Sequence, residues 1–240
     1  GLSVRIGRGR KVAFMGGNGS GKSTFFLCLN GILRPDEGRV LIDGEPVSYT
    51  RKGLLDVRKK VGIVFQEPDN QLFSASVFQE ISFGILNLGV DEETARREVE
   101  KVIRELEITP FQNRPAHALS GGQKKQVAIA DILVMHLDAA HTKKVHELIR
   151  GLTEQGITVL MSLHDIDYAW AWADEIVLMH EGKVMKQGTP REVCEDEEAL
   201  KKAGLARPGV LRIYEKLKGR GMLLGDQIPG SMDELAEMLS

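Results

Sequence analysis

The sequence has little of what marks several specialised protein classes. Only 2 of its 240 residues are cysteines, Cys28 and Cys194, which suits a reducing compartment, and its length allows a substantial core without disulfides. No apolar run approaches the roughly 20 residues that a membrane-spanning helix needs. The best candidate, residues 157–163, is predicted to be a buried strand. With 32 basic and 34 acidic side chains, no overall positive charge marks a nucleic-acid binder, so any such role must rest on a local patch.

What remains is ordinary for a soluble globular protein, with 42% hydrophobic and 28% charged residues. Near its start, residues 11–24 read KVAFMGGNGSGKST, and the apolar stretch FFLCL follows. This pattern predicts a strand, a phosphate-binding loop and a helix, because glycines let backbone N–H groups close around phosphates and a helix directs its positive end at them. The predicted ligand-binding residues are Gly16, Gly17, Asn18, Gly19, Ser20, Gly21, Lys22, Ser23 and Thr24. Lys22 is expected to reach the β and γ phosphates of a nucleotide, and Ser23 to bind Mg²⁺.

A second motif narrows the class of nucleotide-binding protein. Residues 119–135 read LSGGQKKQVAIADILVM, where Ser120 is well placed as an N-cap and the apolar residues have helical spacing. This segment resembles the signature motif of ABC ATPases. The resemblance implies that Ser120, Gly121, Gly122 and Gln123 face the γ phosphate of ATP held by a second ATPase subunit.

Two single residues fit the same family in order and context. Gln66, after the predicted strand VGIVF, resembles the glutamine of the family's Q-loop, which binds Mg²⁺ or the attacking water. His164, near the end of the predicted strand 157–163, resembles the switch histidine, which contacts the γ phosphate. The resemblance therefore implies catalytic roles for Gln66 and His164.

The resemblance also implies the fold and its divisions. We expect an α/β P-loop NTPase core, RecA-like with an antiparallel β subdomain, together with an ABC helical subdomain over about 67–119. Residues 1–206 would form this nucleotide-binding domain, and 207–240 a short C-terminal helical extension. An apolar stripe over residues 91–106 predicts one amphipathic helix of the subdomain. After His164 the sequence predicts two short strands around the turn Glu181–Gly182 and a helix start at Thr189–Pro190.

The stretch QEPDNQLFSASVFQEISFG is similar to ATPase subunits of energy-coupling factor importers, most of all those of the cobalt and nickel group. The resemblance implies partners: a second ATPase subunit, a transmembrane coupling subunit and a substrate-binding membrane subunit. It also implies a peripheral location at the cytoplasmic face of the membrane, with cobalt as the expected cargo. Leu72, Phe73, Val77 and Phe78 could contact the membrane partner or pack inside the subdomain. Nucleic acid is not expected as a partner.

One departure from the family falls on the chemistry. After the signature, the family carries an apolar strand ending in Asp and then Glu, whereas this chain reads MHLDAAHTKK, with Asp138 followed by Ala139. In the family the Asp holds Mg²⁺ through water and the Glu is the general base. Asp138 is a candidate metal ligand if it ends this strand, but it could instead belong to the family's later D-loop, which its spacing to His164 fits somewhat better. A true deletion would remove a central strand of a buried sheet, and a chain without that strand should not fold. We therefore expect that the sequence omits roughly a dozen residues here, and that its start at Gly1 is also late.

Two alternatives stay open. One is a regulatory subunit that binds ATP without hydrolysing it, which follows if the general-base Glu is truly absent. The other is an ABC protein acting on nucleic acid or ribosomes, through clusters such as Arg58–Lys60 and Lys124–Lys125.

The helix after the signature departs from the family at two positions. It carries Gln126 where a basic residue is usual, and Asp131 where Gly or Arg is common.

Overall fold

The computed structural model describes residues 1–64, 72, 74–87, 89–135, 153, 156–223 and 227–239. The chain divides into two compact units. The first combines Gly1–Ser23 with Leu152–Ser240, and the second is Thr24–Gly151. Across the described ranges, no helix is both long enough and apolar enough to cross a membrane.

The first unit is built on a mixed four-stranded sheet in the order β4-β1-β5-β6. The strands are β1 (Lys11–Met15), β4 (Val159–Ser162), β5 (Glu175–His180) and β6 (Lys183–Gly188). β1 runs parallel to β4 and to β5, whereas β6 is antiparallel to β5. Because β1 is central, its apolar residues 12–15 are completely buried, as expected for a strand covered on both faces. The strands predicted in residues 11–15 and 157–163 are thus confirmed.

The β5–β6 hairpin and the helix after it also agree with the sequence. Glu181 and Gly182 both have positive φ, 46° and 71°, as a tight hairpin turn requires. Thr189 then caps α8 (Pro190–Cys194) in a capping box with Glu192. The local sequence signals therefore determine this part of the fold.

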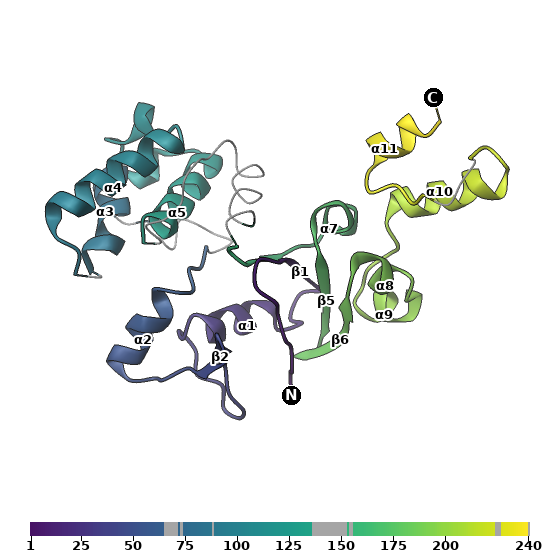
Figure 1. The fold of residues 1–240 in the computed structure, drawn as a ribbon, viewed down its shortest axis with the longest axis horizontal. Coiled ribbons are helices and arrows are strands. Elements are labelled where there is room, and N and C mark those ends of the chain that lie inside the picture. The colour runs from purple at the N-terminus through teal and green to yellow at the C-terminus, as the bar shows by residue number, and fades with distance from the viewer. Residues whose placement is uncertain are drawn as a thin grey trace. The chain divides into compact units, whose positions relative to one another are not determined.

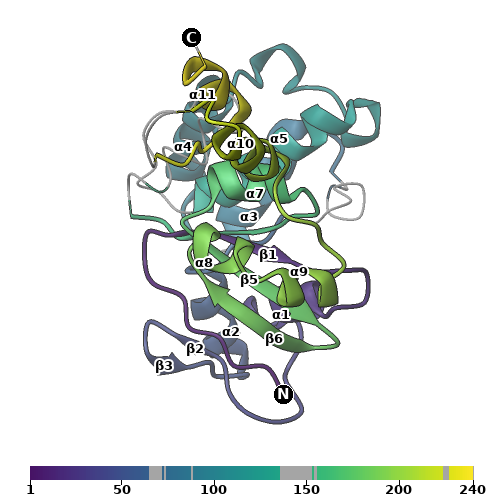
Figure 2. The ribbon, with the colours of Figure 1, turned by 90° about the vertical axis from the view of Figure 1, so that its right-hand side faces the viewer.

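The first unit also contains several helices. They are α7 (Ile166–Trp172), α8, α9 (Glu197–Lys202), α10 (Gly209–Gly219) and α11 (Met232–Glu237). Helices α8 and α9 contact strand β5, and they lie over one face of the sheet in Figure 2. Helices α10 and α11 contact each other, so the C-terminal stretch is helical as predicted (Figure 1). The expected domain boundary at residue 206 stays a prediction.

The second unit contains a small hairpin and a group of helices (Figure 1). Helix α1 (Lys22–Leu29) leads into it and is followed by the antiparallel strands β2 (Leu41–Ile42) and β3 (Glu45–Pro46). Helix α2 (Arg51–Arg58) comes next. The helices after that are α3 (Val77–Asn87), α4 (Glu92–Glu105) and α5 (Gly121–Met135), with the short 3-10 helices Thr109–Phe111 and Ala116–Ala118 between α4 and α5.

Helices α3, α4 and α5 pack against one another. The predicted amphipathic helix is α4: Asp91 is its N-cap, and the apolar stripe Ala95, Val99, Val102, Ile103 and Leu106 is buried. In α3, Val77 is buried, as is Leu72 ahead of it, so neither supplies an exposed contact for a partner. Phe78 is half-buried, and Phe73 lies outside the described residues.

The structure corrects the prediction of a strand at VGIVF. Residues 61–64 are described without strand structure, and Phe65 lies outside the described residues. A strand needs a neighbour for its ladder of hydrogen bonds, and the described part of the chain pairs none with this stretch. Instead Asn30 Nδ2 donates to the Val61 carbonyl, and Gly62 lies so close to Ile132 of α5 that a Cβ at Gly62 would approach it to 2.3 Å.

Candidate functional site

The predicted phosphate-binding loop begins where the buried strand β1 ends. Gly16 has a φ of 144°, and a Cβ there would lie 2.1 Å from the carbonyl oxygen of Met179. No side chain fits at that distance, because real Cβ contacts do not fall below about 3 Å. Gly16 is therefore required by the close approach of strand β5.

The turn between β5 and β6 braces the other side of the loop. The Gly182 N–H donates to the Ser20 carbonyl at 3.0 Å, and Ser20 is buried. Gly21 has a φ of 98°, and a Cβ there would lie 3.3 Å from Gly182 Cα. The loop is thus held from outside by Gly182, which lies 162 positions after Ser20 in the sequence, a contact that no local motif could have revealed.

Lys22 lies inside the loop. Its Nζ donates to the Gly16 carbonyl at 2.6 Å, to the Gly17 carbonyl at 3.1 Å and to Ser20 Oγ at 3.1 Å. The residue is 7% exposed, and burial lowers the pKa of its ammonium group. A compact positive charge therefore sits at the centre of the loop, bound to acceptors that an anion could replace.

Other residues of the loop face solvent. Gly17, Asn18 and Gly19 are exposed, as are Ser23 and Thr24 in the first turn of α1. The first N–H groups of a helix have no partner within the helix, and its N-terminus carries partial positive charge. Buried anchors and an exposed face of N–H and hydroxyl groups together form a suitable site for phosphate.

His164 lies at the same edge of the sheet as this loop. Phe14 and Ser162 are register partners on the parallel strands β1 and β4, and the Leu163 N–H continues the ladder to the Phe14 carbonyl at 3.0 Å. His164 follows directly and is exposed. Asp165 then caps α7 by accepting from the backbone N–H groups of Asp167 and Tyr168. The structure therefore brings His164 to the carboxyl edge from which the phosphate-binding loop leaves.

The predicted signature residues form the start of α5 in the second unit. Ser120 Oγ accepts from the Gln123 N–H at 3.3 Å, and Gln123 Oε1 accepts from the Ser120 N–H at 2.9 Å. These reciprocal bonds confirm Ser120 as the N-cap. Gln123, predicted only as a ligand-binding residue, also has this structural role.

Gly121 and Gly122 are exposed, and a Cβ at either would have no heavy atom within 4 Å. Neither has a positive φ among the described glycines. Glycine costs about 1 kcal/mol relative to alanine within a helix, so two adjacent glycines here are not explained by backbone strain or by packing inside the unit. They leave the N-terminus of α5 open to close approach from outside.

Gln66 and Asp138 lie outside the described residues, as do the other residues of 136–144. Gln126 and Asp131 lie on α5. Gln126 Nε2 donates to the carbonyl of Leu106, the C-cap of α4, at 2.5 Å, so a structural role accounts for it. Asp131 is partly buried, and burial together with the nearby carboxylate of Glu80 raises its pKa to about 7.

Comparison with known proteins gives a family match. The family model described as "ABC transporter" matches residues 1–139. A "Putative ABC transporter ATP-binding protein" of Methanosarcina mazei is 40% identical over 250 positions, covering 99% of this chain but 55% of the relative's length. The "Energy-coupling factor transporter ATP-binding protein EcfA" of Methanocaldococcus jannaschii is 42% identical over 241 positions, covering 95% of this chain and 85% of the relative. The chain therefore spans about half the length of one of these relatives and most of the other.

The alignment with the Methanosarcina mazei relative is longer than the chain itself. Its 250 aligned positions exceed the 240 residues here by ten, so the relative contains positions that have no counterpart in this sequence. A protein of Methanococcus maripaludis, 39% identical, aligns over 254 positions. Relatives of this kind thus carry at least ten additional residues within the matched stretch.

Solved structures share the fold. One is described as "cbiO1 from clostridium perfringens: Part of the ABC transporter complex cbiONQ". It has a TM-score of 0.71 and 40% identity, with 91% of each chain covered. A dimeric post-hydrolysis state of the ATP-binding cassette MJ0796 with ADP and Pi has a TM-score of 0.68 and 27% identity, covering 79% of this chain and 89% of that one. These structures confirm the expected P-loop NTPase fold.

Proposed function

This chain belongs to the ABC transporter family of ATP-binding proteins, and from that premise we propose that it hydrolyses ATP to power uptake through a membrane partner. The observation that carries the proposal is the loop Gly16–Thr24, in which Lys22 Nζ donates to the Gly16 carbonyl and helix α1 begins at Lys22. His164 leaves the sheet at the same edge, two residues beyond the register partner of Phe14.

In this proposal the loop binds the phosphates of ATP. Backbone N–H groups at Gly17–Gly19 and the first turn of α1 donate to phosphate oxygens, while Lys22 exchanges its carbonyl acceptors for the β and γ phosphates. Ser23, exposed in that turn, would hold Mg²⁺ through its hydroxyl, a hard oxygen ligand of the kind Mg²⁺ prefers. Mg²⁺ supplies neutralisation of charge on the phosphate oxygens. His164 would contact the γ phosphate, and Gln66 would bind Mg²⁺ or orient the attacking water.

The signature at α5 belongs, in the proposal, to the site of a second subunit. Two copies or two related chains would associate head to tail, so that Ser120–Gln123 of one approach the γ phosphate held by the loop of the other. The exposed, side-chain-free start of α5 supports this, because an N-terminus without Cβ atoms lets an anion come close. ATP would close the pair by adding contacts that exist only in the closed state, and hydrolysis would remove them.

No residue of this sequence is assigned as the general base. The family's Glu has no counterpart after Asp138, while relatives carry at least ten additional positions. We propose that the natural protein contains the missing strand, with its Asp and Glu. An intact mass of 26.5 kDa would contradict this and would mean that the Glu is truly absent.

A catalytically inactive, regulatory ABC subunit is the second candidate, favoured by that same absence. General-base catalysis contributes about 10² to 10⁴ in rate, so the two candidates differ strongly in turnover. ATP hydrolysis by the natural full-length protein with its membrane partners decides: clear turnover, lost in Lys22→Ala, supports the enzyme. Tight ATP binding without turnover supports the regulatory subunit.

The transport system is proposed from the relatives. Proteins named energy-coupling factor ATP-binding subunits and the cbiO1 structure support an importer of that type at the cytoplasmic face of the membrane. Its partners would be a transmembrane coupling subunit and a substrate-binding membrane subunit, and its cargo cobalt. Uptake of labelled cobalt by vesicles containing the whole complex tests the cargo, and uptake of another substrate instead would contradict it.

A further inference from the structure

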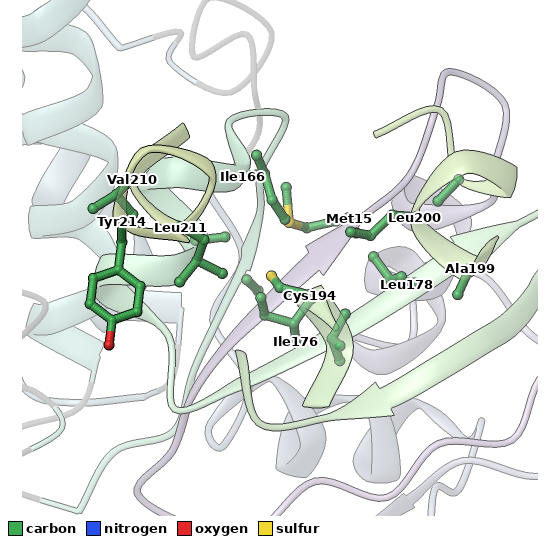
Figure 3. Packing of buried hydrophobic residues seen from close by; sticks show 14 of the residues in the cluster. Met15, Ile166, Ile176, Leu178, Cys194, Ala199, Leu200, Val210, Leu211 and Tyr214 are labelled. Carbon is green, nitrogen blue, oxygen red and sulfur yellow. The ribbon is translucent and has the colours of Figure 1, made fainter. Parts of the chain in front are cut away.

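Residues near the C-terminus are part of the hydrophobic core that packs on the four-stranded sheet. One cluster of buried side chains joins Met15 of β1, the residue before Gly16, with Ile166 and Ala169 of α7. The same cluster includes five residues of the C-terminal segment: Val210, Leu211, Tyr214, Leu223 and Leu235. Figure 3 shows Val210, Leu211 and Tyr214 on one side of this cluster, with Met15 and Ile166 nearer its middle. Residues 208–223 and 227–239, hereafter the C-terminal segment, therefore contribute to the core that contains Met15, the residue before the phosphate-binding loop.

Two hydrogen bonds connect this segment directly to α7. Trp170 Nε1 donates to the carbonyl of the buried Pro229 at 3.0 Å. Asp167 Oδ1 accepts from the backbone N–H of Val210 at 3.3 Å. The bonds join residues 59 and 43 positions apart, so they are tertiary contacts rather than local turns.

Helix α7 depends on such contacts for its position. It has 7 residues, whereas isolated helices shorter than about 12 residues are marginal in water. Its N-cap, Asp165, directly follows His164. The backbone at His164 is thus held between strand β4 on one side and the first turn of α7 on the other.

We propose that the C-terminal segment positions His164 for contact with the γ phosphate, acting through α7 and the bonds of Trp170 and Asp167. This inference rests on the proposed function, in which His164 touches that phosphate. Trp170 and Asp167 are positioning residues, because they act through the helix that fixes the histidine.

The test measures affinities for ADP and for a non-hydrolysable ATP analogue, so it requires no turnover. The variant Trp170→Phe keeps the aromatic ring but removes the N–H donor, and Asp167→Ala removes the acceptor. In the double variant, we expect analogue affinity to fall about fivefold, the equivalent of one ordinary hydrogen bond, while ADP affinity stays within about twofold of the original.

Two matched variants serve as controls. Trp172→Phe makes the same change on the same helix, at a ring that stacks on Tyr168, and should leave both affinities unchanged. Asp167→Asn keeps an oxygen acceptor and should restore analogue affinity when it replaces Asp167→Ala.

His164→Ala separates the possible results. By itself it should reduce the preference for the analogue over ADP, and adding the double variant should then cause no further loss. If His164→Ala leaves that preference unchanged, its proposed contact is wrong and this inference falls with it. If His164→Ala reduces the preference but the double variant does not, only the positioning role is contradicted. An equal loss of both affinities in the double variant would show a general structural effect and also overturn the inference.

Discussion

Phe14 of β1 and Ser162 of β4 are register partners, and Gly16 and His164 each follow two residues later. Parallel strands present their carboxyl ends at one edge of a sheet, so this pairing places the phosphate-binding loop and the histidine together. Residues Gly16–Ser23 of the loop and His164 belong to the first unit, together with Gly182, which donates a hydrogen bond to the loop. The proposed chemistry depends on this edge, and its predictions can be tested residue by residue.

Lys22→Ala removes the charge at the centre of the loop. We expect ATP affinity to fall by at least about tenfold, because a charge-assisted contact with phosphate contributes about 1.5–3 kcal/mol. Isothermal titration measures this, with Lys183→Ala, an exposed lysine of β6, as the control that should bind normally. Unchanged ATP binding and hydrolysis in Lys22→Ala would refute the site assignment.

Gly16→Ala introduces a Cβ 2.1 Å from the Met179 carbonyl, so β5 or the loop must move. We expect the free energy of unfolding to fall by about 3 kcal/mol or more. Gly19→Ala is the matched control, since its φ is 76° but the Cβ would meet open space, and it should cost about 1–3 kcal/mol. Denaturant unfolding of both variants gives the comparison, and equal losses would contradict the close approach of Met179.

Gly122→Ala separates folding from ligand contact at α5. A Cβ there has room within the unit, so stability should be unchanged or rise by up to about 1 kcal/mol. ATP hydrolysis by the paired subunits should nevertheless fall at least about tenfold, because the methyl group would obstruct a phosphate held by the second subunit. Full turnover in a well-folded Gly122→Ala protein would mean that nothing approaches α5 closely.

Asp131 predicts a dependence of stability on pH. Its pKa is raised from 3.8 to about 7 in the folded state by burial and by Glu80, so between these values the folded protein binds the proton and the unfolded chain releases it. The free energy of unfolding should therefore fall as pH rises from about 4 to 7, by up to about 1.4 kcal/mol per pH unit from this group. Denaturant unfolding across that range, compared with Asp131→Asn, measures the contribution. Identical pH profiles for the two proteins would show that Asp131 is ionised throughout.

Local signals in the sequence predicted much of the fold. The capping box at Thr189, the turn at Glu181–Gly182 and the N-cap at Ser120 each depend on residues at most four positions apart. The stripe from Ala95 to Leu106 follows from helical periodicity alone. Such features are determined by residues that are close together in the sequence, and the structure confirms them.

Long-range contacts could not be predicted in this way. Nothing near Gly16 indicates that Met179 would lie against it, and nothing near Trp170 indicates Pro229. The strand expected at residues 61–65 failed for a related reason, since strand formation at Val61–Val64 depends on a neighbour elsewhere in the chain. The roles of Gln66 and Asp138 stay predictions.

Mixing two inactive variants tests the central claim most directly. A head-to-tail pair of Lys22→Ala with Gly122→Ala has one site with both defects and one site with an intact loop and an intact α5. We expect each variant alone to be inactive with its membrane partners, and an equal mixture of self-pairing chains to recover about a quarter of the original ATP hydrolysis, assuming random pairing and independent sites. A mixture as inactive as its components would contradict an ATP site shared between the loop of one subunit and the signature of the other.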